Sequence, residues 1–236
     1  GPAGDWFIFH RLWGLGLPAF GALIRKMVYN ELLLGYLGEV WFYSWARKNG
    51  EIEGSPFGAV KDVAVLSAVA GNIMTLVMVL AIIPYADLLP IGDNIHEIVW
   101  SLAFVLVSSV AITLWRKAVF SLSSGQLSMI FTVHMARTLA QTGLTAVLWH
   151  LVLPDIALTW WLVLATVRLL ITRLPFIPNK DVAFAGIVVA MTSSGAMTAS
   201  LMAMMAGLIV LANLGFGMAL SMHDLRKGGR VDRIAR

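Results

Sequence analysis

The sequence predicts an all-helical polytopic membrane protein with about six transmembrane helices and with re-entrant or interrupted helical segments. Of the 236 residues, 59% are hydrophobic and only 13% are charged, whereas soluble domains carry about 25% charged residues. The mean hydropathy is +0.82. Charged side chains this sparse cannot cover the surface of a soluble protein of this size, so soluble enzymes and disordered proteins are excluded. The chain has no cysteine, which excludes disulfides and thiolate metal sites.

The first apolar segment, residues 31–45, is predicted not to span. It has only 15 residues, fewer than the roughly 20 that a spanning helix needs. The basic pairs at 25–26 and 47–48 flank it, and both favour the cytoplasmic side. The segment therefore either re-enters the membrane, with its helix broken at Gly35 and Gly38, or lies on the surface as an amphipathic helix.

Six spans are predicted after this segment. They are Val63–Ile83, Glu97–Trp115, Gln126–Leu153, Asp155–Leu174, and two within Val182–Met222 that are separated by a turn at Thr192–Gly195. Lys and Arg residues occur before the first span and after the second, fourth and sixth, and they are absent from the other connections. Since cytoplasmic loops are enriched in Lys and Arg, this alternation supports the count and places the C-terminus in the cytoplasm.

We therefore expect a single transmembrane domain over residues 1–236. Residues 1–62 form its interfacial or re-entrant part, residues 63–222 its six-span bundle, and residues 223–236 a basic cytoplasmic tail. The tail is interpreted as a topology determinant beside anionic headgroups, and a nucleic-acid partner is not expected. Because the chain begins with Gly1, we also expect a processed or longer natural N-terminus.

A second interrupted segment follows the fourth span. Pro175 and Pro178 break a helix there, and Lys180 and Asp181 place charges just before the next apolar stretch. One interpretation is a plain cytoplasmic loop. Alternatively, the two interrupted segments, in comparable places in the two halves of the chain, mark a transporter's binding site.

Ionisable residues within the predicted spans indicate a binding site. His134, Arg137 and Gln141 share one face of the third span, and Arg168 lies at a similar depth in the fourth. A charged side chain at the bilayer centre costs about 2.5–3.5 kcal/mol, so its presence there calls for a function. Arginine binds phosphate through two parallel hydrogen bonds. The four residues are therefore predicted to bind a lipid headgroup.

Two alternatives to this prediction stay open. Both arginines could extend to the headgroup region, or they could pair with Glu31 or Glu39 of the first interrupted segment. His134 could be a hydrogen-bonded packing residue.

Residues 30–48 carry a family resemblance. The segment NELLLGYLGEVWFYSWARK resembles the motif N-x-L-L-P-G-R-x-G-E of the lysylphosphatidylglycerol synthase transmembrane-region family, also called flippase-like, with Asn30, Gly35, Gly38 and Glu39 in register. The segment LPFIPNKDVAFAG, from Leu174, is similar to the L-P-x-x-P-G-G-x-G-x-x-E turn of the same family. The soluble synthase domain of some members is absent. The resemblance implies a transmembrane module that moves lipids between leaflets.

These observations give one expected function and one alternative. We expect a flippase-like protein of the bacterial inner membrane that binds an anionic phospholipid or glycolipid headgroup and aids its movement between leaflets. In this mechanism Arg137 and Arg168 hold the phosphate, while Glu39 and Asp181 organise the arginines or line the path. The alternative is a non-transporting scaffold or accessory subunit of an envelope-lipid biosynthetic complex. A homo-oligomer or an envelope-complex partner is compatible with either.

Enzymatic activity is not expected. The five histidines lack metal-ligand spacing, and no G-x-S-x-G motif or phosphate-binding loop is present. The sequence therefore predicts no catalytic residue, no metal site and no cofactor.

Overall fold

The computed structural model describes residues 1–33, 37–49, 56–88, 120–173, 180–191 and 196–234, and these parts of the chain are helical with no strand. The helices are α1 (Pro2–Trp13), α2 (Pro18–Leu32), α3 (Leu37–Asn49), α4 (Pro56–Ile82), a 3-10 helix η1 (Ile83–Leu88), α7 (Ser124–Val152), α8 (Leu158–Ile171), α9 (Lys180–Met191) and α10 (Ala196–Ile234). The predicted helical class is confirmed. The predicted second span, residues 97–115, lies outside the described residues.

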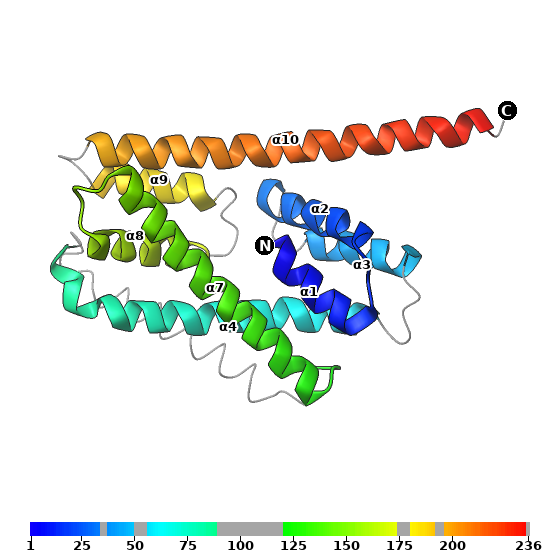
Figure 1. Ribbon diagram of the computed structural model, residues 1–236, viewed down its shortest axis with the longest axis horizontal. Helices are drawn as coiled ribbons and strands as arrows, with labels where there is room; N and C mark the ends of the chain where they lie inside the picture. The colour runs from blue at the N-terminus through cyan, green and yellow to red at the C-terminus, as the bar shows by residue number, and fades with distance from the viewer. Residues whose placement is uncertain (34–36, 50–55, 89–119, 174–179, 192–195, 235–236) are drawn as a thin grey trace.

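Two long helices, α4 and α10, extend along the long axis of the molecule (Figure 1). The hairpin of α8 and α9 lies at one end of this axis, and α1, α2 and α3 lie at the other (Figure 1). Helix α7 crosses the molecule diagonally and contacts α4, α8 and α1. The connected ends of the α2–α3 and α8–α9 pairs therefore face each other near the middle of the molecule.

The helix lengths differ from the predicted spans. Within the described residues, two segments are long and apolar enough to cross a membrane, Pro56–Tyr85 and Ser200–Leu220. The predicted fourth span forms a helix of only 14 residues, which ends at Ile171, and α9 has 12 residues. At 1.5 Å per residue, these two helices reach only about 21 and 18 Å, so the prediction that each spans is not confirmed. Helices α8 and α9, on either side of residues 174–179, contact each other.

Helix α7 joins two separate apolar cores. Near its start, Leu127 and Ile130 pack in a core with residues of α1, α2, α3 and α4. Near its end, Ala146 and Trp149 pack with α8, α9 and α10. Between these ends the sequence turns polar, from His134 to Thr145. The two cores therefore hold a polar helix segment between them.

The start of α7 is anchored on α4. Ser123 caps the helix: its hydroxyl accepts from the backbone N–H of Gln126, whose side chain accepts in turn from the N–H of Ser123, as in a capping box. Just before this cap, Asp62 of α4 accepts hydrogen bonds from the N–H of Ser121 at 2.7 Å, from its hydroxyl at 2.9 Å and from the N–H of Leu122 at 2.9 Å. The Asp62 side chain is fully buried, so it fixes where α7 starts.

We predict that Asp62→Ala lowers the free energy of unfolding by about 2–3 kcal/mol, because three donors lose a charged acceptor. The measurement is thermal unfolding of the detergent-solubilised chain, with Asp155→Ala, at an exposed carboxylate between α7 and α8, as the control. Equal unfolding midpoints for the two variants would contradict the assignment.

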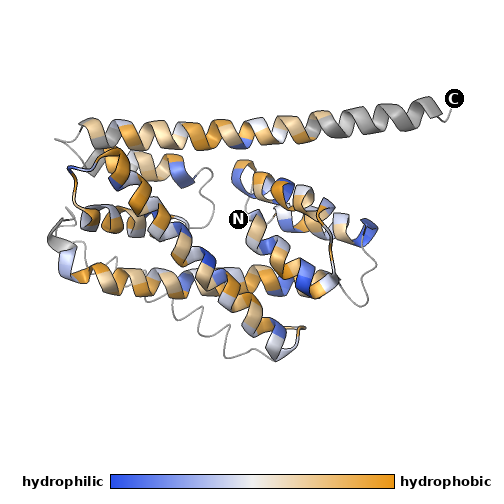
Figure 2. Cartoon of the chain, in the orientation of Figure 1, coloured by the Kyte–Doolittle hydropathy of each residue, from blue (hydrophilic) through white to orange (hydrophobic). Residues whose placement is uncertain are grey.

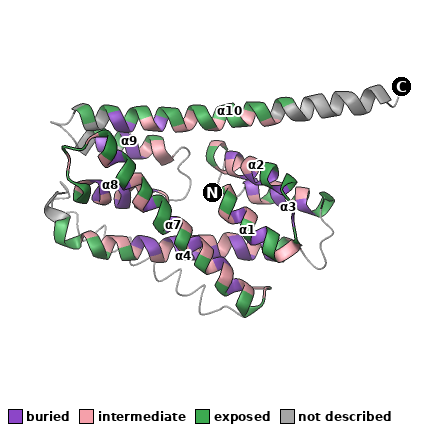
Figure 3. Cartoon of the chain, in the orientation of Figure 1, coloured by how far each residue is buried: buried purple, intermediate pink, exposed green. Residues whose placement is uncertain are grey.

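Large apolar side chains remain exposed on the long helices. Figure 2 shows hydrophobic residues predominating on α4 and α10, and Figure 3 shows α10 exposed over much of its length. On α10 these residues include Met204, Leu208, Leu211, Phe216 and Met218. A contiguous apolar surface of this kind is unusual on a soluble monomer and is typical of contact with lipid or with another protein.

Candidate functional site

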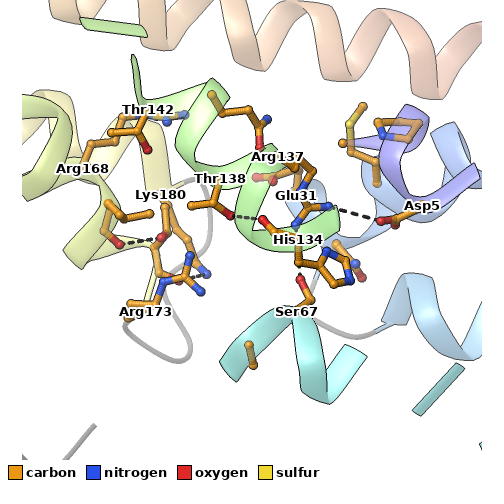
Figure 4. A pocket seen from close by; sticks show the side chains of 18 of the residues that line it. Asp5, Glu31, Ser67, His134, Arg137, Thr138, Thr142, Arg168, Arg173 and Lys180 are labelled. Carbon is orange, nitrogen blue, oxygen red and sulfur yellow. Dashed lines mark hydrogen bonds and ion pairs between the residues drawn. The ribbon is translucent and has the colours of Figure 1, made fainter. Parts of the chain in front are cut away.

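A cavity of about 640 Å³ lies between the two hairpins and against the polar segment of α7. Ser67 of α4, with its neighbours, forms another wall. The described ends of both hairpins line the cavity: Asn30, Glu31 and Glu39 from the α2–α3 pair, and Thr172, Arg173 and Lys180 from the α8–α9 pair. Figure 4 shows Glu31, Arg173 and Lys180 among the side chains around this space. All four predicted headgroup residues, His134, Arg137, Gln141 and Arg168, line this same cavity.

The first interrupted segment, with Asn30, Gly38 and Glu39, lies where α2 ends and α3 begins. The side-chain oxygen of Asn30 accepts from the backbone N–H of Gly38 at 2.8 Å, so Asn30 satisfies a free N–H in the first turn of α3. Its amide group donates to Glu39 at 3.2 Å. Gly35 lies outside the described residues.

The sequence predicted that Gly38 breaks the helix. Gly38 instead lies within the first turn of α3. A Cβ atom at this position would collide with the backbone oxygen of Lys26 and would lie 2.6 Å from the side-chain oxygen of Asn30. The glycine is therefore needed for the close approach of α2 and α3, not for backbone flexibility.

We predict that Gly38→Ala destabilises the chain by about 1–3 kcal/mol, since the two helices must separate to admit the methyl group. Gly21→Ala, in α2, is the matched control because nothing lies within 4 Å of its added Cβ, and alanine favours a helix by up to about 1 kcal/mol over glycine. Unfolding midpoints in detergent measure both. A Gly38→Ala variant as stable as Gly21→Ala would contradict the close approach.

A buried ion network joins α1, α2 and α3. The ammonium group of Lys26 lies 2.7 Å from Asp5 and 3.3 Å from Glu39, and Lys26 is only 7% exposed. Burial alone would lower the pKa of Lys26, but the two carboxylates outweigh it and raise the pKa. The sequence prediction treated Lys26 as a topology marker, and nothing there pointed to Asp5.

The network continues to α7 through Arg137. Its guanidinium group lies 3.2 Å from the carboxylate of Asp5 and donates to the hydroxyl of Ser67 at 3.3 Å. The ion-pair alternative for this arginine named Glu31 or Glu39, but the partner in the described residues is Asp5. His134 lies three positions before Arg137 on α7, and it is only 1% exposed. Both of its ring nitrogens, and Nε of Arg137, are buried with no hydrogen-bond partner in the described parts of the chain.

Because of Asp5, the stability of the network depends on pH. Burial alone would raise its pKa, but Lys26, Arg137 and His134 outweigh that effect, so the pKa lies below its ordinary value of 3.8. A carboxyl group whose pKa is lower in the folded state stabilises the fold above its ordinary pKa. This stabilisation is lost as the pH falls through the folded-state value.

We therefore predict that wild type loses more stability between pH 5 and pH 2 than Asp5→Asn does, while Asp5→Asn is less stable by about 3 kcal/mol at neutral pH. Unfolding midpoints across this range measure the difference. Glu31, whose pKa is raised by burial and then by Asp181, titrates in both proteins and cancels in the comparison. Parallel pH profiles would rule out Asp5 as the acid-sensitive group.

Arg168 is held by the α8–α9 hairpin itself. Both its Nε and its Nη2 atoms lie 2.6 Å from Oδ1 of Asp181, so Asp181 positions this arginine. Lys180 donates to the backbone oxygen of Thr172 at 2.8 Å, which ties the two helices together. Pro175 and Pro178 lie outside the described residues.

Arg173 was missed as a site residue because it was counted among the cytoplasmic loop cations. Its guanidinium group packs so closely on Gly71 that a Cβ there would collide with it. Gly71 lies in the middle of α4, and Arg173 therefore lies deep between the helices. Residues 174–179 of this segment lie outside the described residues, so its interpretation as a cytoplasmic loop or as a binding-site segment stays a prediction.

Basic side chains are in excess around the cavity. The described lining residues include five basic side chains and three carboxylates: Lys26, Arg137, Arg168, Arg173 and Lys180 against Asp5, Glu31 and Glu39. Counting Asp181, which pairs with Arg168, as a fourth carboxylate still leaves one positive charge. The site thus favours an anion.

An apolar cavity of about 530 Å³ adjoins the polar one. The two share Glu39, Ala64 and Ala68, and Tyr43 and Phe57 are among the other residues of the apolar cavity. Polar and apolar spaces of this size side by side are suited to an amphiphilic molecule. Among the described residues, no group of three or more His, Asp or Glu side chains could hold a metal ion.

No family model, no curated protein and no solved structure matches the chain.

Proposed function

We propose that this chain is a polytopic membrane protein that binds the anionic headgroup of a phospholipid or glycolipid and aids its movement between leaflets. The observation that carries the proposal is the cavity of about 640 Å³ lined by the ends of two interrupted helix pairs and by an excess of basic side chains. Interrupted helices that meet at a polar site are characteristic of transporter binding sites. A scaffold needs no such space, so the cavity favours transport over the alternative.

In the proposed arrangement α4, α7 and α10 cross the bilayer. They have 27, 29 and 39 residues, against the roughly 20 that a span requires. The α2–α3 and α8–α9 hairpins enter from opposite faces and stop at the cavity. Backbone that ends at membrane depth is tolerated where it lines a wet cavity. The C-terminus lies in the cytoplasm of a bacterial inner membrane, as the Lys and Arg distribution favours.

The mechanism follows from the charge of the cavity. When a lipid phosphate enters the cavity, guanidinium and ammonium groups replace the water molecules that were bonded to it. The phosphate therefore avoids the free-energy cost of crossing the hydrocarbon without hydrogen-bond partners. Asp5 and Asp181 keep the arginines extended toward the cavity while the acyl chains stay in apolar surroundings. This is the role expected of the flippase-like family that the two motifs resemble.

A leaflet-exchange assay tests the proposal. Proteoliposomes carrying fluorescent phosphatidylglycerol should exchange it between leaflets with wild type, and at least about tenfold more slowly with Arg137→Gln, because the loss of one charge-assisted contact of about 1.5–3 kcal/mol weakens headgroup binding. Arg47→Gln, at an exposed arginine on α3, is the control. Wild-type exchange at the protein-free rate would support the scaffold alternative and reject transport.

A further inference from the structure

The strongest unexplained feature of the cavity is the face of α4 between Ser67 and Gly71. These residues are four positions apart, so they lie on the same face of the helix, on consecutive turns about 6 Å apart along its axis. Ser67 accepts from the guanidinium group of Arg137 at 3.3 Å. Gly71 lies against the guanidinium group of Arg173. Two arginines from distant parts of the chain thus rest side by side on one helix.

Small side chains on α4 make this arrangement possible. The absence of a side chain at Gly71 leaves room for the Arg173 head, and a Cβ at that position would displace it. A serine at position 67 both admits and bonds Arg137. Both arginines line the same cavity.

We infer that Arg137 and Arg173 together form a phosphate-ester site on the Ser67–Gly71 face of α4, completed by His134. The two guanidinium groups contact α4 at positions one turn apart, and each can donate to a phosphate oxygen at about 2.8 Å. The inference rests on the proposed function and names the part of the cavity that takes the headgroup.

Unused hydrogen-bonding capacity at this face supports the assignment. Nε of Arg137 and both ring nitrogens of His134 are buried and have no partner in the part of the chain that the structure describes. Buried polar atoms are nearly always paired in folded proteins. A phosphate group has several acceptor oxygens, so it can accept from Nε of Arg137 and from the single N–H of a neutral His134 on α7, and also from Arg173, which follows α8.

Arg168, by contrast, is a positioning residue in this assignment. Two of its nitrogens already contact Asp181 at 2.6 Å, and this contact holds the α8–α9 hairpin together. The sequence prediction that Arg137 and Arg168 hold the phosphate is thus revised to Arg137 and Arg173. The roles of Arg173 and Arg168 can be distinguished by experiment. A change at Arg173 should weaken ligand binding, and a change at Arg168 should lower the stability of the α8–α9 hairpin.

Ligand-induced stabilisation of the full detergent-solubilised chain tests this inference. Unfolding midpoints are measured with sodium phosphate, with glycerol 3-phosphate, and with phosphatidylglycerol in mixed micelles, against sodium chloride of equal ionic strength and against diacylglycerol. Wild type should be stabilised by at least one of the phosphate compounds and not by diacylglycerol. Stabilisation by all three compounds supports a site for free or esterified phosphate, and stabilisation by phosphatidylglycerol alone supports a lipid headgroup.

Variants then locate the site. Arg173→Gln and Gly71→Ala should each weaken the apparent affinity for the stabilising compound about tenfold or more. Gly143→Ala, on α7 with nothing within 4 Å of its added Cβ, should leave the affinity unchanged. Arg168→Gln should lower the midpoint without ligand and keep the affinity.

Two results would overturn the inference: no stabilisation of wild type by any phosphate compound, or loss of the response in Arg168→Gln but not in Arg173→Gln. If wild type binds phosphate compounds but exchanges no lipid in vesicles, the proposed transport fails and this site stands. If it exchanges lipid and Arg173→Gln exchanges at the wild-type rate, the site fails and transport stands.

Discussion

The carboxylate of Asp5 is the contact on which the centre of this molecule depends. It joins α1 to Lys26 of α2 and to Arg137 of α7, and Lys26 extends the network to Glu39 of α3. An unpaired charge buried among apolar helices is very costly, so each member of the network requires the others. These contacts hold the N-terminal helices against α7. The helices complete one wall of the polar cavity.

Short helices follow from the same constraint. Helices α2, α3, α8 and α9 have 15, 13, 14 and 12 residues, and each ends where a polar cavity can satisfy its terminal backbone groups and its charged side chains. The Asn30 side chain bonds the first turn of α3, and Lys180 bonds the last turn of α8. The two apolar cores on either side of α7 can then remain dry while the space between them is polar.

The sequence predicted the long elements and the polar face well. The expected span 126–153 corresponds to the helix α7 at Ser124–Val152, whereas the expected turn at 192–195 lies outside the described residues. His134, Arg137, Gln141 and Arg168 line one cavity, as their common depth predicted. These successes follow from hydrophobic length and helical periodicity, which are local properties of the chain.

What the sequence could not predict depends on tertiary contacts. Counting Lys and Arg cannot show which side chains line an internal cavity, so Arg173 was not predicted as a site residue, and both it and Lys180 line the cavity. Lys26 was interpreted as a surface cation because its partners, Asp5 and Glu39, lie 21 positions before and 13 positions after it. Gly38 and Gly71 serve close approach rather than flexibility, and close approach is visible only when a second helix is in place.

In the proposed membrane arrangement, the central position of the cavity has an electrical consequence. A wet space takes on the voltage of the compartment to which it is connected, so the membrane potential is concentrated across the thinner apolar layer that remains. Moving one elementary charge through 100 mV involves about 2.3 kcal/mol. An anionic molecule that reaches Arg137 and Arg173 from the connected compartment meets almost none of this voltage, and the remaining step meets nearly all of it.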